Sequence, residues 1–423
     1  MITTDQPRVK SKVPRTIVEL VIATICSAAA AFTVELILLT VLSGPTLGMR
    51  DFVVYWATGQ QEAHHLNPYD RDGLLQRERA AGLRPDMGVM FMRNPPTALP
   101  IVYPLGLLNL RAASLVWPLP LLIAFGFSVY LLRGMHGNPK NRRHLLAYSF
   151  GPALICLMNG QSTVFALLGL VLFLRFHRTQ PYVAGMCLWL CSLKPHLFLP
   201  FGVAMIAWIL FTRNLKLLAG IGVAMAANFA VMLSIDPRAW KQYLQMLHIS
   251  GIDQDFIPCT SYFLRTWISP HTLWLQYLPA GLACAWALRY FWIRRNEWDW
   301  IKHGSLLLLV SILAAPYSWL YDQVLAIPAL LHGSYVSKSR NLLALLALLS
   351  ALTEIALFCN SVKPSAVYLW TVWTAPVWLV WYLAASASQT ESQHHWPLNV
   401  KNWFRTASLT RATRDFPVHQ PTD

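Results

Sequence analysis

Apolar residues form long runs along most of the chain, and short polar segments separate these runs. The first run, residues 17–42, is long enough to cross a hydrocarbon core, which needs roughly 20 residues. A cleaved signal peptide has an apolar centre of only roughly 7 to 15 residues, so we interpret this run as an uncleaved first span. Further runs lie at approximately 112–132, 144–158, 163–176, 182–193, 197–212, 217–235, 272–292, 304–315, 321–333, 341–359 and 365–384. The pattern predicts an all-α polytopic membrane protein, a bundle of about twelve transmembrane helices.

Two longer polar stretches, at 43–96 and at 236–271, interrupt the runs. Residues 43–96 are polar, and the apolar run that follows, 97–110, is short and rich in proline, so we expect a re-entrant or interfacial piece there. The predicted parts are a basic cytoplasmic leader (1–16), one transmembrane domain (17–384) with outer loops (43–111 and 236–271), and a disordered cytoplasmic tail (385–423).

The basic residues indicate the orientation of the chain. With Met1 in the cytoplasm, about two thirds of the 34 Lys and Arg residues fall in inside segments, as the positive-inside rule requires. Acidic residues in the two outer loops offset most of the basic residues there. We therefore expect a plasma (inner) membrane protein with both termini in the cytoplasm.

Composition excludes two other classes of protein. With 55% hydrophobic and 13% charged residues and a mean hydropathy of +0.42, the chain has too little polar material to coat soluble domains. The net charge of +15 is typical of nucleic-acid-binding proteins. Most basic residues, however, lie in short clusters between apolar runs, the distribution that sets membrane orientation, so this class is excluded as well. The seven cysteines are odd in number and form no CxxC metal motif, so neither a disulfide framework nor a zinc site is predicted.

Two of the short runs end in polar turns. The run at 144–158 is followed by Asn159-Gly160-Gln161, and the run at 182–193 is followed by Lys194-Pro195-His196. Helices this short place their turns below the membrane surface, where irregular backbone is tolerated only next to protein or a water-filled cavity. We infer a cavity that opens to the outside.

Asp51 is the first candidate for chemistry, at the boundary between the first run and the outer loop. One interpretation is a helix N-cap, because Asp accepts well from backbone N–H groups. The other is a general base, since a carboxylate in a partly dry cleft can take a proton from a sugar hydroxyl.

Lys194 is the second candidate, a cation that ends one short run and precedes a proline. It is either a lysine whose charged end snorkels to the interface or a cation placed to bind a lipid phosphate. His196 could donate to the same phosphate, and so could Arg93. The remaining polar residues expected to line the pocket are Asn94, Gln161, Tyr317, Ser318 and Asp322.

Metal ligands are weakly indicated. The adjacent histidines at 64–65 and at 394–395 lack the i, i+4 spacing of a helical zinc site. Asp253 and Asp255 form an acidic pair that can hold a divalent ion, although two acids in a polar loop are more often solvated. No metal site or cofactor is predicted, and a divalent ion at this pair stays an alternative.

Six motifs follow one another along the chain. They are Asp51 with Tyr55-Trp56, Asn67-Pro68-Tyr69-Asp70, Asn94-Pro95-Pro96 with Tyr103-Pro104-Leu105, Asn159-Gly160-Gln161, Leu193-Lys194-Pro195, and Pro316-Tyr317-Ser318-Trp319. Together they resemble the motifs of glycosyltransferase family 87. The resemblance covers roughly residues 45–330. The sequence departs from the family pattern at Asn94, where an aromatic residue is common, and at Leu320-Tyr321-Asp322, where histidines are common.

The resemblance implies a hexosyltransferase of the GT-C class, which takes a sugar, typically mannose, from a polyprenyl phosphate at the outer face. It implies that Asp51 is the catalytic base and that Lys194 and its neighbours bind the donor phosphate. Attack opposite the leaving phosphate inverts the anomeric carbon, and needs one base on the acceptor side and cations on the phosphate side. The expected partners are a polyprenyl-phosphate sugar, a lipid or glycan acceptor and the bilayer, without nucleic acid.

A transporter or flippase of a lipid-linked glycan is the alternative, because broken helices and buried polar residues also mark transporters. Transporters of that kind usually contain related halves, and this sequence contains no inverted or direct repeat. Their polar groups lie near the membrane midplane, whereas those found here lie toward the predicted outer ends of the spans. The pattern therefore favours an enzyme.

Overall fold

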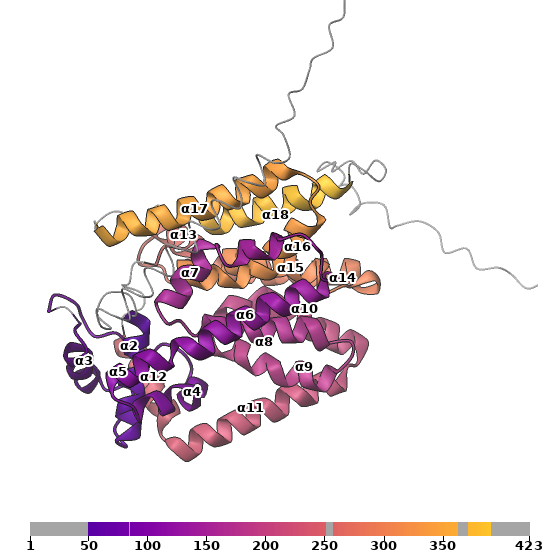
Figure 1. The fold of residues 1–423 in the computed structure, drawn as a ribbon. Helices are drawn as coiled ribbons and strands as arrows, with labels where there is room; N and C mark the ends of the chain where they lie inside the picture. The colour runs from indigo at the N-terminus through magenta and orange to yellow at the C-terminus, as the bar shows by residue number, and fades with distance from the viewer. Residues whose placement is uncertain (1–49, 84, 251–256, 363–370, 391–423) are drawn as a thin grey trace, which may run out of the picture.

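The computed structural model describes residues 50–83, 85–250, 257–362 and 371–390. Within these residues the secondary structure is helical, without any β-strand. The long helices lie in stacked layers, with α17 and α18 along the top of Figure 1, α6, α8 and α10 in the middle and α11 along the bottom. The predicted first span at 17–42 and most of the predicted tail lie outside the described residues.

Short helices from the first predicted outer loop gather at one end of the molecule (Figure 1). They are α2 (Arg50–Ala63), α3 (Arg71–Ala80), the 3₁₀ helix η1 (Pro96–Ala98) and α4 (Leu99–Gly106). Helix α5 (Leu110–Val116) follows, at the beginning of the next predicted span. Helix α12 (Ala239–Ile249), from the second predicted outer loop, lies at the same end. The two predicted outer loops are therefore neighbours in space.

Helices α2 and α4 pack unusually closely, because glycines face each other at the contact. A Cβ atom on Gly59 of α2 would collide with the carbonyl oxygen of Val102, and a Cβ atom on Gly106 would collide with the backbone of Gly59. Trp56 Nε1 donates to the carbonyl of Leu108 at 3.0 Å, which fixes the same face of α2. This close approach fixes α2 beside the segment that follows it.

Replacing Gly59 with alanine should therefore push α4 away from α2. We expect the Gly59→Ala protein to lose about 1–3 kcal/mol of stability, the usual cost of overpacking, although alanine is the better helix former. Thermal unfolding in detergent measures the effect. Gly126→Ala is the matched control, because a Cβ atom there meets nothing within 4 Å. Equal melting temperatures for the two variants would contradict the close packing.

The remaining helices form the layers. From the first half of the chain they are α6 (Pro118–Met135), η2 (Arg143–Ala147), α7 (Gly151–Met158), α8 (Thr163–Phe176), α9 (Pro181–Cys187), η3 (Leu188–Leu193), η4 (Pro195–Phe198), α10 (Leu199–Thr212) and α11 (Leu215–Ile235). From the second half they are α13 (Thr260–Ile268), α14 (Trp274–Arg294), η5 (Arg295–Glu297), α15 (Lys302–Ala314), η6 (Leu320–Ala326), α16 (Ile327–Val336), α17 (Arg340–Val362) and α18 (Thr374–Thr390). Helix α8 is almost fully buried, in contact with α6, α9, η3 and η6.

Several predicted spans are interrupted helices. The runs at 144–158, 182–193 and 321–333 each contain a 3₁₀ segment next to an α-helix, namely η2 with α7, α9 with η3, and η6 with α16. Pro152 and Pro328 lie in the first turns of α7 and α16. Proline has no backbone N–H and is tolerated in a first turn, so it marks where a new helix begins.

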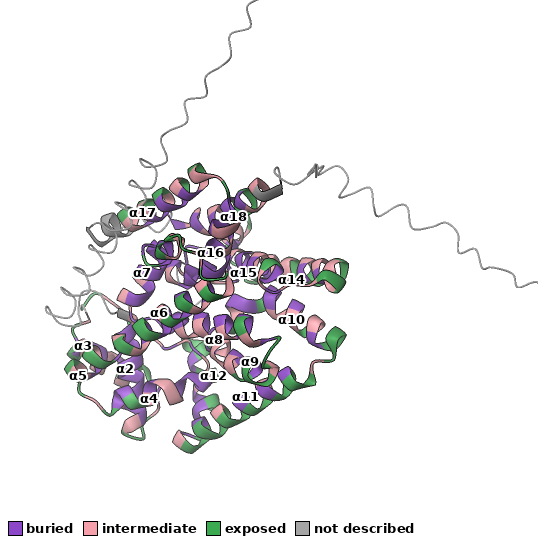
Figure 2. Cartoon of the chain, turned by 45° about the vertical axis from the view of Figure 1, so that its right-hand side comes forward, coloured by how far each residue is buried: buried purple, intermediate pink, exposed green. Residues whose placement is uncertain are grey.

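Three helical segments among the described residues are long and apolar enough to cross a membrane, Leu110–Met135, Pro195–Thr212 and Leu215–Ile235. Most of the α11 surface is exposed although its residues are apolar (Figure 2). Apolar surface of this extent marks contact with lipid or protein. These features identify an all-helical membrane protein, whereas the number of twelve spans stays a prediction.

Candidate functional site

A buried ion pair lies at the centre of the polar region. Lys194, between η3 and η4, places Nζ 2.7 Å from Oδ1 of Asp322, in the first turn of η6. Their side chains are only 10% and 2% exposed. Burying two charges is costly unless further hydrogen bonds satisfy both of them, so the partners of each residue decide what this pair can do.

Both oxygens of the Asp322 carboxylate are engaged. Oδ1 accepts from Thr163 Oγ1 at 2.8 Å in addition to Lys194, and Oδ2 accepts from the backbone N–H of Trp319 at 3.0 Å. The second contact caps η6. A carboxylate with these partners is fixed as a counter-ion and is poorly placed to accept a proton from a substrate.

The ammonium group of Lys194 connects Asp322 to the polar turn after α7. Nζ donates to Gln161 Oε1 at 2.8 Å and lies 4.9 Å from the ring centroid of Tyr321. Gln161 Oε1 also accepts from the hydroxyl of Tyr55, at 3.1 Å. The network therefore reaches α2, because Tyr55 lies on that helix.

The start of α2 is fixed on the same turn. The backbone N–H of Phe52 donates to the carbonyl of Asn159 at 3.1 Å, and Trp117 Nε1 donates to the carbonyl of Gly160 at 2.7 Å. Gly160 has a φ of +68°, and a Cβ atom on it would lie 2.9 Å from Phe52 Cβ. Glycine is the residue that adopts this conformation without strain, so it permits the contact with α2.

Asp51 lies one helical turn before Tyr55 on α2 and is half-buried. Burial is the main cause that raises the pKa of Tyr55 to about 12, while the charge of Lys194 opposes this rise and the charge of Asp51 adds to it. Both charges therefore act on the same buried hydroxyl. Asp51 and Lys194, 143 positions apart in the sequence, lie in one neighbourhood, with Tyr55 and Gln161 between them.

Asn94 and Arg93, two further predicted site residues, have different partners. Asn94 joins the network, because its Nδ2 donates to the carbonyl of Leu193 at 2.9 Å and to Ser162 Oγ at 3.3 Å. Arg93 instead donates from Nη2 to the carbonyl of Ser250 at 3.0 Å, at the end of α12.

The rings of His196 and Tyr317 lie against each other, with centroids 3.9 Å apart and planes tilted by 31°. Ser318 is buried next to Trp319 and donates to its carbonyl at 3.5 Å. The acidic pair Asp253 and Asp255 lies outside the described residues.

Tyr55, Ser162 and Thr163 complete the network but were not predicted as site residues. Tyr55 hydrogen-bonds to Ser162 Oγ at 3.0 Å as well as to Gln161. The available signal was spacing, since Tyr55 follows Asp51 by four residues and therefore lies on the same face of a helix. Ser162 and Thr163 directly follow Gln161, at the start of α8.

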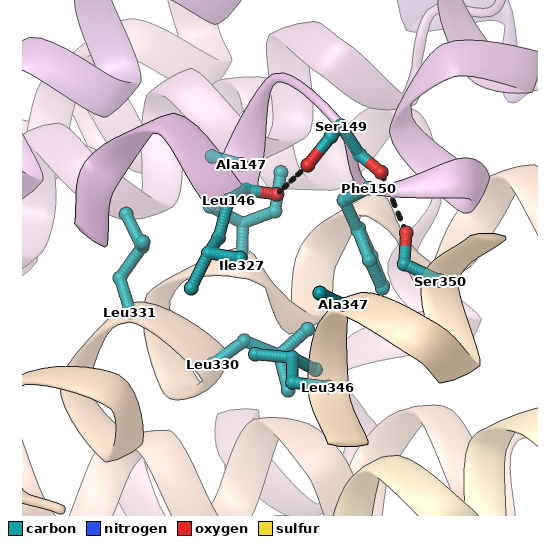
Figure 3. A pocket seen from close by; sticks show the side chains of 10 residues that line it. All are labelled: Leu146, Ala147, Ser149, Phe150, Ile327, Leu330, Leu331, Leu346, Ala347 and Ser350. Carbon is teal, nitrogen blue, oxygen red and sulfur yellow. Dashed lines mark hydrogen bonds between the residues drawn. The ribbon is translucent and has the colours of Figure 1, made fainter. Parts of the chain in front are cut away.

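The described residues include no group of three or more His, Cys, Asp or Glu side chains able to hold a metal ion. An apolar pocket lies elsewhere, between the segment that joins η2 to α7 and helices α16 and α17 (Figure 3). Ser350 Oγ donates there to the carbonyl of Ser149 at 2.6 Å and accepts from the backbone N–H of Gly151 at 2.9 Å. The Ser350 hydroxyl in this pocket is engaged in hydrogen bonds within the fold, so we assign no chemistry to the pocket.

The fold and the site together define a membrane protein in which the buried Lys194 and its counter-ion Asp322 belong to a polar network that reaches α2, the helix of Asp51. A comparison with protein families matches residues 91–316, more than half of the chain, to glycosyltransferase family 87, and the chain belongs to this family. No curated protein and no solved structure matches the chain. The matched region contains Lys194, whereas Asp51 and Asp322 lie outside it, so their place in the site depends on the geometry.

Tyr55 is expected to position Gln161 and, through it, Lys194. Tyr55→Phe keeps the ring but removes the three hydrogen bonds of the hydroxyl, with Gln161 Oε1, Ser162 Oγ and the backbone N–H of Ser162. We expect transfer to fall at least about tenfold, because the loss of even one or two bonds in a buried network costs about 1–2 kcal/mol. Initial rates of sugar transfer at matched protein levels measure this. Tyr130→Phe, in an exposed position on α6, should keep the wild-type rate. A Tyr55→Phe protein with the same rate as Tyr130→Phe would contradict the role.

Proposed function

We propose that this glycosyltransferase moves a hexosyl residue from a polyprenyl phosphate to a lipid or glycan acceptor at the outer face of the plasma membrane. The expected sugar is mannose. Asp51 is the general base. Lys194 binds the donor phosphate, with His196 and Arg93 as the expected further donors. The observation that carries the proposal is a chain of contacts: Asp51 lies one helical turn before Tyr55, and the Tyr55 hydroxyl and Lys194 Nζ both donate to Gln161 Oε1.

The two charged groups match the needs of an inverting transfer. An acceptor hydroxyl must lose a proton as it attacks, and the leaving phosphate gains negative charge as its bond to the sugar breaks. Both oxygens of Asp322 are engaged, so this acid is fixed as the counter-ion of Lys194. Asp51 is half-buried at the start of α2, and the family resemblance implies that it takes the proton.

Lys194 has capacity for one phosphate oxygen. An ammonium group has three N–H donors, and side chains among the described residues engage two of them, at Gln161 and Asp322. The buried position strengthens any charge-assisted bond to the third donor, because the local dielectric constant is low. Lys194 can thus bind the phosphate without leaving its counter-ion.

The chain belongs to a glycosyltransferase family, which argues against the alternative of a lipid-glycan transporter. A buried cation is also found in transporters, but Lys194 together with the half-buried Asp51 supplies the two groups that transfer needs. The enzyme is therefore the function that we carry forward.

The proposal is tested with membranes that contain the chain and a radiolabelled polyprenyl-phosphate sugar. We expect label to move into lipid or glycan with polyprenyl-phosphate mannose and to stay in the donor with a nucleotide-linked mannose. Membranes from cells without the chain provide the background. Transfer from the nucleotide-linked sugar alone would overturn the proposed donor.

A further inference from the structure

Helix α13 exposes apolar side chains and buries polar ones. Its two buried residues are Ser261 and Arg265. Near its C-terminal end, Trp267 is 88% exposed, and Ile268 is exposed as well. A helix that faces water shows the opposite arrangement, with its apolar side chains toward the core. In a membrane, polar side chains face the protein interior, because lipid chains cannot form hydrogen bonds with them. The outer surface of α13 is therefore suited to lipid.

The first turn of α14 continues this surface. Trp274 and Tyr277 are exposed there, next to the exposed Leu273. A short polar turn joins the two helices, and the hydroxyls of Ser269 and Thr272 in this turn are hydrogen-bonded to each other at 2.8 Å. Trp and Tyr next to polar groups are typical of the head-group region of a bilayer, since their rings meet apolar chains while their polar atoms meet water. The aromatic end of α13 and α14 consists of Trp267, Ile268, Leu273, Trp274 and Tyr277.

The opposite end of α14 has the composition of a second membrane interface. Trp292 is exposed, and the guanidinium carbon of Arg295 lies 4.4 Å from its ring centroid. Trp274 and Trp292 are eighteen positions apart, which corresponds to about 27 Å along a helix, close to the thickness of about 30 Å of a hydrocarbon core. Between them, residues 278–288 include no charged residue, and Leu282 is exposed. The two ends are therefore spaced as the two surfaces of a bilayer are.

Hydrogen bonds connect the aromatic end to a predicted site segment. Gln276 Nε2 on α14 donates to the carbonyl of Pro316 at 2.6 Å. Ser261 Oγ on α13 donates to the carbonyl of Ala314 at 3.3 Å. Asp322, a member of the buried ion pair, follows Pro316 by six positions in the same segment. The depth of the aromatic end in the membrane therefore affects the depth of the site.

We propose that the aromatic end of α13 and α14 lies among the lipid head groups and holds the segment at Pro316 near the level of the lipid phosphates. A protein partner would also cover exposed rings, but it would not explain the spacing between the two ends of α14. Arg289, Arg294 and Arg295 lie at the other end, and the positive-inside rule favours the cytoplasm for that end and the outer leaflet for the aromatic one. The contact with lipid stands by itself, whereas its benefit for donor binding rests on the proposed function.

Photo-crosslinking of the full chain in vesicles tests this contact. The protein with Trp267→benzoylphenylalanine is reconstituted with phosphatidylethanolamine and phosphatidylglycerol that contain radioactive phosphorus in the phosphate and tritium in the acyl chains. We expect illumination to attach phospholipid to residue 267. Asp72→benzoylphenylalanine, at an exposed polar position on α3, is the control and should give no phospholipid adduct above background.

The label that remains after mild alkaline hydrolysis reports depth, because this treatment separates the acyl chains from the glycerol phosphate. Adducts on the head group or glycerol keep the phosphorus label, and adducts on an acyl chain keep only tritium. We expect phosphorus to remain at residue 267. Leu282→benzoylphenylalanine, from the middle of α14, should keep only tritium.

A second position guards against a misfolded variant. Leu273→benzoylphenylalanine, on the same surface, should give the same adducts as the variant at Trp267, and both proteins should melt near the wild-type temperature. Crosslinks to a second copy of the chain or to another protein segment instead of lipid, or tritium alone at both positions, would overturn the proposal. The readout needs no donor, so Asp51→Asn should leave the lipid adducts unchanged, and failure of the transfer proposal would not alter them.

Discussion

Asp51→Asn should reduce sugar transfer by about 10²- to 10⁴-fold, the usual contribution of a positioned general base, while the donor still binds. Asparagine keeps the shape of the side chain but cannot accept a proton from the acceptor hydroxyl. The loss should therefore appear in the turnover rate, with little change in the donor concentration needed for half-maximal rate. Radiolabelled transfer and donor binding are measured on the same membranes.

Asp72→Asn is the matched control for this change, because Asp72 is an exposed acid on α3 in the same predicted outer loop. It should transfer sugar at the wild-type rate. If Asp51→Asn retained full transfer at normal levels in the membrane, another group would have to be the base. Asp322 would then be examined first, despite its engaged oxygens.

Lys194→Met should abolish detectable donor binding and also destabilise the protein. Removing one member of a buried ion pair leaves the other charge without compensation, at a cost of about 3–5 kcal/mol. Loss of transfer by this variant alone is therefore ambiguous, since the protein could be unfolded. The informative variant changes both members.

The double variant Lys194→Met with Asp322→Leu replaces the pair by apolar side chains of similar size, which often restores stability. We expect its melting temperature to return toward that of the wild type while donor binding stays lost. Lys216→Met, which removes an exposed lysine at the start of α11, should bind donor normally. A stable double variant that binds and transfers like the wild type would limit the pair to a structural role.

The positions of the polar turns were predictable from the sequence. Gln161 and Lys194 each follow an apolar run too short to span a membrane, and the hydrogen bond between them, 2.8 Å long, joins these two turns. Helix α8 coincides with the predicted run at 163–176, because polar segments, 159–162 and 177–180, bound this run on both sides. Local apolar pattern thus located the helices and the ends at which polar side chains gather.

The partners within the network were not predictable in the same way. Asp322 was expected to line the pocket, but its ion pair joins residues 128 positions apart, and a local pattern contains no information about such contacts. Tyr55 lies in a segment rich in apolar and aromatic residues, where a tyrosine is typical of a membrane interface. The role of Tyr55 depends on the close packing of α2 against Gly160, and this packing exists only in the folded chain.

The central claim is that Asp51 and Lys194 act on opposite sides of one bound donor. An electron cryomicroscopy structure of the full-length Asp51→Asn protein with a polyprenyl-phosphate sugar tests it most directly. We expect a phosphate oxygen within hydrogen-bond distance of Lys194 Nζ and the anomeric carbon of the sugar facing residue 51. Donor phosphate bound away from Lys194, or packed protein between the sugar and residue 51, would contradict the account.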